Sequence, residues 1–254
     1  MSGLLSAVAF LTRVPVAGRR PQAWTDLGSA VPWFPVVGAA VGLVVGGSYA
    51  LASAALPALL AAGLSVGLGV LLTGAFHEDG LADTADAFGG GRTKEETLRI
   101  LRDPSLGTYG VVSLVLTAFV RVAAIAALGP WTALAAVPAI HALARGAAVG
   151  AMATFPTATE DGLGAAYARQ VSPRRAGTGV AGALLIAAAG VGWWSVPAAV
   201  LAGSGGLLVG LVARRRIGGI TGDVLGAIEQ LVETALLVLA AAGAVGGVEL
   251  AWWR

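Results

Sequence analysis

Long apolar runs separated by short charged stretches constrain this chain more than any other feature of its sequence. Each run is near the roughly 20 residues that a helix needs to cross the hydrocarbon of a bilayer. Only 12% of the residues are charged, against about 25% in a soluble domain, so a soluble fold would lack the polar surface to cover itself. The sequence therefore predicts an all-α polytopic integral membrane helix bundle. The expected spans are about seven, at 31–56, 57–76, 107–128, 131–154, 176–193, 196–213 and 224–248.

Other features of the sequence further limit the possible folds and functions. Residues 1–12 are apolar but too short to span, and they predict an interfacial or re-entrant helix without the order of a removable signal peptide. No segments of alternating polarity favour a β-barrel. The chain has no cysteine and a net charge of only +2, which gives no support to thiolate metal sites or to nucleic-acid binding. No linker or repeat divides it, so residues 1–254 are expected to form one domain.

Basic residues lie in alternate connections between the expected spans. They precede the first span and fall between the second and third, the fourth and fifth, and the sixth and seventh, at Arg13, Arg19, Arg20, Arg92, Lys94, Arg99, Arg102, Arg169, Arg174, Arg175 and Arg214 to Arg216. The turns near Pro57, Pro130 and Pro197 have none. Because basic loops stay on the cytoplasmic side, we expect a cytoplasmic N-terminus and a lipid bilayer around the bundle.

An acidic stretch reading HEDGLADTAD follows the second expected span. Asp79, Asp83 and Asp86 are spaced i, i+4 and i+7, so on a helix they fall within about 60° of one another. Carboxylates on one stripe repel each other, and a divalent cation removes that conflict. The stretch therefore predicts a Mg2+–phosphate site on the cytoplasmic side. A solvated acidic loop and a cation-transport site are the alternatives.

The segment RDPSLGTYG comes next and begins with Arg102 and Asp103. The chain restarts as a helix near Thr108, where backbone N–H groups can hold an anion, or where Thr108 can act as a cap. Lys94 and Arg102 lie on the same side of the membrane as the aspartates. They serve as topological markers, and they can also clamp phosphates. Asp223, in GGITGD, is either a further metal or substrate ligand or a helix-start residue.

Five ionisable residues lie inside expected spans, namely Arg121, His141, Arg145, Glu229 and Glu233. Placing such groups against lipid costs several kcal/mol in order of magnitude, so they should face the bundle interior. We expect Arg121 or Arg145 to pair with Glu229 or Glu233. These charges indicate either structural ion pairs or a polar cavity for an anionic substrate.

Four segments resemble the cobalamin synthase family, the adenosylcobinamide-GDP ribazoletransferases. HEDGLADTADAFGG at 77–90 is the most specific, and RDPSLGTYG at 102–110, FLTRVPV at 10–16 and GGITGDVLGA at 218–227 occur in the family's order. Glu78 departs from the hydrophobic residue usual there, and it is either an extra surface charge or an outer-shell ligand. Arg102 replaces a common lysine and keeps the charge.

The resemblance implies a multi-pass enzyme of the bacterial cytoplasmic (inner) membrane. It would join adenosylcobinamide-GDP to α-ribazole or its 5′-phosphate, releasing GMP, with Mg2+ as cofactor. Asp79, Asp83 and Asp86 would hold the metal, completed by Asp223 or Asp103. A homo-oligomer, or a complex with other late corrinoid-pathway enzymes, is compatible with the sequence.

The remaining candidate residues act on the substrates in this interpretation. Those assigned to substrate binding are Arg13, Lys94, Arg102, Asp103, Thr108, Tyr109, Arg121 and Arg145. A carboxylate or His77 would take the hydroxyl proton. On a helical wheel His77 points about 160° from Asp79, which weakens its candidacy.

Two other functions stay open at this level. A CDP-alcohol phosphatidyltransferase-like enzyme also uses an aspartate-rich membrane helix, but there Asp-Gly is followed by Ala-Arg, whereas Leu81, Ala82 and Asp83 follow here. An ion-coupled transporter would suit the intramembrane Arg121, Arg145 and Glu233, although no internal repeat supports it.

Overall fold

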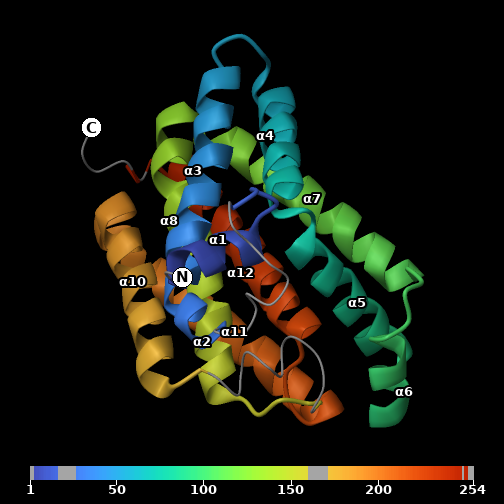
Figure 1. The fold of residues 1–254 in the computed structure, drawn as a ribbon. Coiled ribbons are helices and arrows are strands. Elements are labelled where there is room, and N and C mark those ends of the chain that lie inside the picture. Colours follow the sequence, from blue (N-terminus) through green and yellow to red (C-terminus); the bar gives the residue numbers. More distant parts are fainter. Residues whose placement is uncertain (1–2, 17–26, 160–170, 248, 251–254) are drawn as a thin grey trace.

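The computed structural model describes residues 3–16, 27–159, 171–247 and 249–250. This part of the chain is a bundle of helices, and its only β-type pairing is a single bridge between Thr157 and Ile220 (Figure 1). The elements are α1 (Gly3–Leu11), α2 (Leu27–Ala30), η2 (Val31–Trp33), α3 (Phe34–Ala52), α4 (Ala58–Thr73), α5 (Phe76–Gly90), α6 (Lys94–Ile100), α7 (Thr108–Leu128), α8 (Pro130–Thr154), α10 (Pro173–Val191), η3 (Gly192–Trp194), α11 (Ser195–Ile217) and α12 (Gly222–Val245).

The all-α membrane architecture predicted from hydropathy is confirmed. Five helices of the described residues are long and apolar enough to cross a membrane, or six if α4 and α5 together count as one bent span. One of the five, Pro173–Ile217, joins α10 and α11 through η3. At 1.5 Å per residue α10 is about 28 Å long and α11 about 35 Å, so each alone approaches or exceeds the hydrocarbon thickness. The predicted count of about seven is therefore approximate.

Helices α8 and α12 form the centre of the bundle, and α7 lies at its edge. The close packing of α3 on α8 depends on a row of glycines at i, i+4 and i+8. A Cβ at Gly38, Gly42 or Gly46 would lie 2.7 Å from a backbone oxygen of α8. Small residues of this kind let helix backbones approach in a membrane, where lipid offers no hydrophobic drive for association. The high glycine content thus fits close helix packing.

The polar stretch folds as two helices. The acidic helix predicted to begin near His77 is α5, and it is followed by the short helix α6. Thr93 caps α6, because its side-chain oxygen accepts a hydrogen bond from the Glu96 N–H at 3.2 Å. The predicted N-terminal helix is α1, and its Ala7 and Leu11 are buried against the bundle. Arg19, Arg20 and Arg169 lie outside the described residues.

Candidate functional site

The break between α4 and α5 sets the direction of the acidic helix. The chain bends by 91° here, and the residues of the break, Gly74 and Ala75, have φ of +70° and +58°. Arg13 lies against the break: its backbone N–H donates to the Leu72 carbonyl at 2.8 Å, and its side chain fills the space beside Gly74. The bend takes α5 away from the axis of α4 and lays it along α7 and α12.

A close crossing of α5 and α12 brings the two acidic segments together. A Cβ at Gly80 would lie 2.8 Å from the Asp223 carbonyl oxygen and 3.2 Å from the Gly226 Cα. A Cβ at Gly226 would in turn lie 3.3 Å from the His77 carbonyl oxygen. The two glycines therefore allow contact between the helix backbones. This contact places Asp223, at the start of α12, beside the Asp79 turn of α5.

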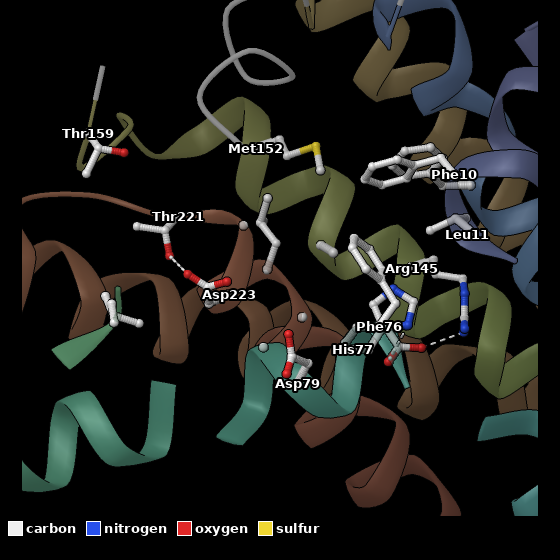
Figure 2. A pocket seen from close by; sticks show the side chains of 18 of the residues that line it. Phe10, Leu11, Phe76, His77, Asp79, Arg145, Met152, Thr159, Thr221 and Asp223 are labelled. Carbon is white, nitrogen blue, oxygen red and sulfur yellow. Dashed lines mark hydrogen bonds and ion pairs between the residues drawn. The ribbon is translucent and has the colours of Figure 1, made fainter. Parts of the chain in front are cut away.

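A cavity of about 470 Å³ opens at this crossing (Figure 2). Its walls come from α1, α3, α5, α6, α8 and α12. The polar and charged lining residues are His77, Asp79, Arg102, Arg145, Thr159, Thr221, Asp223 and Glu229. Large apolar side chains also line it, namely Phe10, Leu11, Phe34, Phe76, Leu98, Leu101, Met152 and Leu225. The cavity therefore combines carboxylates, guanidinium groups and an aromatic surface, and its size suits a small-molecule ligand.

Asp79 and Asp223 provide the acidic wall of this cavity (Figure 2). Asp79 is exposed and Asp223 is half-buried, with Thr221 Oγ1 donating to its carboxylate at 3.3 Å. Asp83 lies one helical turn after Asp79 on the same helix and is also half-buried. Within the described ranges no Lys, Arg or His forms an ion pair with any of these three carboxylates. Grouped anions without a cationic partner are the donor set that a divalent cation stabilises.

The third aspartate of the predicted stripe has a different partner. Asp86 accepts hydrogen bonds from the Gly107 N–H at 2.7 Å and from the Gly110 N–H at 2.8 Å. These N–H groups belong to the start of α7, which the sequence suggested as an anion site. The anion bound there is the Asp86 carboxylate, and the side chain of Thr108 does not cap the helix. Asp86 therefore fixes α7 to α5 beside the cavity.

Three other candidate residues do not line the cavity. Lys94 reaches toward Gly218, and the ring of Tyr109 covers Gly89. Asp103 is exposed and accepts a hydrogen bond from the Ser105 N–H at 2.9 Å. Hydrogen bonding from Ser105 lowers the pKa of the Asp103 carboxyl, so this group stays ionised. Arg102, by contrast, lines the cavity together with Leu98 and Leu101, which brings the end of α6 into the site.

His77 and Asp79 line the same cavity although the helical wheel separates them. His77 is buried, whereas Asp79 is exposed, so the two side chains reach the cavity at different depths. His77 Nδ1 lies 3.6 Å from a Glu229 carboxylate oxygen on α12. The helical wheel separates the two side chains on α5, but the cavity reaches both of them.

The intramembrane charges form one buried cluster across α5, α7, α8 and α12. Arg121 Nη2 lies 2.7 Å from Glu233, and Arg145 Nη1 pairs with Glu229. The predicted pairing of arginines with glutamates between helices is confirmed. Glu78 lies 3.0 Å from Arg121, so its charge belongs to this cluster and not to the surface. Paired in this way, the charges are tolerable inside a bundle.

His141, Glu229 and Glu233 are the described residues whose ligand atoms all lie within 4.8 Å of one another. A cation at that point would compete with the guanidinium groups of Arg145 and Arg121, which already pair with both carboxylates. Glu229 and Glu233 therefore already have cationic partners within the protein. The cluster reaches the cavity through Arg145 and Glu229, which are among the residues that line the cavity.

The aromatic surface of the cavity was not predicted from the sequence. Phe10 and Phe34 are stacked, with ring centroids 5.6 Å apart, and Phe76 meets Phe10 edge-on at 5.0 Å. Phe76 directly precedes His77, and Phe10 opens the segment FLTRVPV. The available signal was that Phe10 lies in one recognised segment and Phe76 directly precedes another. Phenylalanine is so ordinary in a membrane helix that this signal carries little weight alone.

Comparison with known proteins gives one consistent result. The family model described as cobalamin-5-phosphate synthase matches residues 3–241. The adenosylcobinamide-GDP ribazoletransferase of Bradyrhizobium diazoefficiens is 39% identical over 248 residues, covering 97% of this chain and 95% of the relative. The enzyme of the same name from Azorhizobium caulinodans is 40% identical, with 92% of each chain covered.

A third relative agrees. The adenosylcobinamide-GDP ribazoletransferase of Chlorobaculum tepidum is 38% identical over 250 residues, with 95% of each chain covered. No solved structure matches the chain. Since the match runs through every segment that contributes to the cavity, the chain belongs to the cobalamin-5-phosphate synthase family.

Proposed function

We propose that this chain joins adenosylcobinamide-GDP to α-ribazole or its 5′-phosphate and releases GMP. The observation that carries the proposal is the cavity wall where Asp79 and Asp223 lack any basic partner among the described residues. A diphosphate with its metal ion is a ligand that such a wall favours. Membership of a family whose relatives are named ribazoletransferases supports the reaction, and the wall supports its location.

The reaction is a phosphotransfer in which one P–O bond replaces another. The ribose hydroxyl oxygen of the acceptor attacks the phosphorus attached to the cobinamide. The bond from that phosphorus to the bridging oxygen breaks, GMP leaves with that oxygen, and the hydroxyl proton passes to a base. The protein therefore has to align the attacking and leaving oxygens and neutralise charge. A cavity lined by charged side chains can do both.

Magnesium is proposed as the cofactor, held by Asp79 and Asp223 in the cavity wall, with Asp83 one turn further along α5. Among the described residues these carboxylates are free of basic partners, so their charges are available to a cation. Mg2+ commonly binds through one or two carboxylates together with substrate phosphates, so a closed cage of protein ligands is not required. The ion would neutralise diphosphate oxygens. Asp86 would act through the α7 start that it holds.

His77 is the proposed base, because it lines the cavity and its other interaction is with a carboxylate. The Glu229 oxygen 3.6 Å from His77 Nδ1 favours the imidazole orientation in which Nε2 is left for substrate. Asp79 is the alternative base, since it lines the same cavity. Arg102 and Arg145, also in the lining, would bind phosphate oxygens.

The proposed location is the bacterial inner membrane, with the cavity open toward the cytoplasm. The basic connections support this orientation, because positive residues favour the cytoplasmic side. Lys94 begins α6 and Arg102 lies just after it. Arg214 to Arg216 lie in the last turn of α11, where Arg216 donates to the Gly91 carbonyl at the end of α5. Both substrates are large polar molecules, so a cytoplasmic opening would give them access without crossing the bilayer.

The experiment is incubation of the purified protein in detergent or liposomes with adenosylcobinamide-GDP, α-ribazole and Mg2+. We expect stoichiometric appearance of GMP and of the joined corrinoid. A parallel reaction with a CDP-alcohol and an alcohol acceptor tests the phosphatidyltransferase alternative and should give no CMP. Absence of GMP from protein that is folded and monodisperse would overturn the proposal. Solute uptake into liposomes without GMP release would favour a transporter instead.

A further inference from the structure

The cavity has two chemically different sides. Thr221, Asp223 and Asp79 form the acidic side, and Phe10 and Leu11 lie away from Thr221 and Asp223 in the same view (Figure 2). Phe76 lies between these two sides. Its ring centroid is 5.2 Å from that of His77. A ligand with an apolar ring and a phosphate-bearing end would therefore meet matching surfaces at both ends.

Phe76 differs from the two other rings in its exposure. Phe34 is 4% exposed, which is ordinary for a packed core residue. Phe76 is 40% exposed and lines the cavity, while its edge contacts the ring of Phe10. The ring of Phe76 is therefore less covered by protein than the ring of Phe34. The cavity therefore presents aromatic surface that a ligand ring can cover.

The two nucleosides of the reaction differ in the edges of their bases. Guanine carries donors and acceptors on its edge, and leaving them unpaired against an apolar wall has a cost. The base of ribazole is a benzimidazole, whose outer edge carries carbon substituents. The side chains of the wall, Phe10, Leu11, Phe34, Phe76 and Met152, offer no oxygen or nitrogen. The wall thus matches the acceptor base and disfavours the guanine of the donor.

We infer that Phe76, with Phe10, binds the uncharged bicyclic base of the acceptor nucleoside and is a specificity-determining residue. This rests on the proposed function. With the base against Phe76, the attached ribose lies toward His77 and Asp79, which are one and three residues further along the same helix. The hydroxyl that attacks is then on the side of the proposed base. The guanosine of the donor lies outside this wall.

The test compares Phe76→Leu with Phe119→Leu, a matched change on the exposed face of α7, where Phe119 is 67% exposed and does not line the cavity. Loss of an aromatic stacking partner should raise KM for α-ribazole about tenfold. KM for adenosylcobinamide-GDP should not change. Equilibrium dialysis of α-ribazole alone against the solubilised protein should show the same loss of affinity for Phe76→Leu and none for Phe119→Leu.

A second acceptor nucleoside tests the specificity for the base directly. The parent chain should prefer α-ribazole over a nucleoside with a polar-edged purine base, and Phe76→Leu should reduce that preference. Equal increases of both KM values, or a selective rise for the GDP donor, would overturn the inference. If Phe76→Leu does not fold, Phe10→Leu takes its place with the same expectations. Failure of the parent chain to release GMP would refute the proposed function itself, whereas normal turnover with unchanged acceptor KM in the variants would refute this inference alone.

Discussion

The guanidinium group of Arg121 lies 2.7 Å from the carboxylate of Glu233, and both side chains are almost fully shielded inside the bundle. Arg121 also contacts Glu78 at 3.0 Å and the Gln230 side-chain oxygen at 2.9 Å. One arginine thus connects α7 to α5 and to α12, the two helices whose crossing forms the acidic wall. The cluster therefore positions the site as well as pairing the buried charges.

Arg121→Met should therefore destabilise the fold. Removing one partner of a buried ion pair leaves uncompensated charge and typically costs about 3–5 kcal/mol. Glu233 and Glu78 would lose their closest cation. Thermal unfolding of the detergent-solubilised protein should show a clear fall in midpoint. Arg99→Met, at an exposed position of α6, is the control and should unfold as the parent chain does. Equal midpoints for both variants would refute a structural role for Arg121.

Asp83→Asn and Asp79→Asn should lower turnover by about 100-fold or more without impairing insertion or lowering the unfolding midpoint. Both carboxylates lack a basic partner among the described residues. Neutralising them therefore removes repulsion between like charges and breaks no ion pair. The substitutions would weaken binding of the metal–diphosphate. GMP release and thermal unfolding are measured on the same preparations. Near-normal turnover at saturating Mg2+ would contradict a metal role for either residue.

Asp86→Ala should behave differently, because its carboxylate caps α7 through Gly107 and Gly110. Losing a helix cap costs about 1–2 kcal/mol. We expect a lower unfolding midpoint and a turnover, per folded molecule, that falls less than in Asp79→Asn. A parent-like midpoint with abolished turnover would show instead that Asp86 acts on the substrate.

Much of this architecture could be predicted because hydropathy and charge placement are local properties of the sequence. The helical bundle, the acidic helix α5 and the start of α7 near residue 108 all follow from runs of residues. The pairing of Arg121 and Arg145 with Glu233 and Glu229 was also predictable, because buried charges in a membrane need partners.

Features that depend on how helices cross could not be predicted from local properties of the sequence. The three aspartates share one stripe, yet Asp79 faces the cavity while Asp86 binds the start of α7. The presence of His77 in the same cavity depends on the contact of Gly80 with α12 and on the 91° bend before α5. The surroundings of these side chains are set by tertiary contacts, which the periodicity of the sequence does not encode.

Chelation tests the cofactor without changing the protein. Excess EDTA should stop GMP release, and added Mg2+ should restore it, because unpaired carboxylates and a diphosphate cannot share the cavity without a cation. Thermal unfolding in EDTA is the control and should match that of untreated protein, since the buried ionic cluster is compensated by arginines. Sustained turnover in metal-free buffer would exclude a divalent cation from the reaction.

Gly80→Leu should separate α5 from α12 and remove activity without removing the helices. A Cβ at Gly80 would already lie 2.8 Å from the Asp223 carbonyl oxygen, so a larger side chain has to push the two backbones apart. Asp79 and Asp223 would then no longer share one wall. Circular dichroism should show unchanged helix content, whereas turnover should fall by about 100-fold, because small displacements of reacting groups are costly.

The matched control is Gly63→Leu on α4, where a Cβ would meet nothing within 4 Å. Both substitutions replace a helical glycine with the same side chain, so their effects on helix propensity are comparable and only the crossing differs. Gly63→Leu should keep parent-like turnover. If Gly80→Leu retained turnover as well, the close approach of α5 and α12 would not be what builds the acidic wall. A Gly226→Leu variant, altered on the opposite side of the same contact, should reproduce the loss seen with Gly80→Leu.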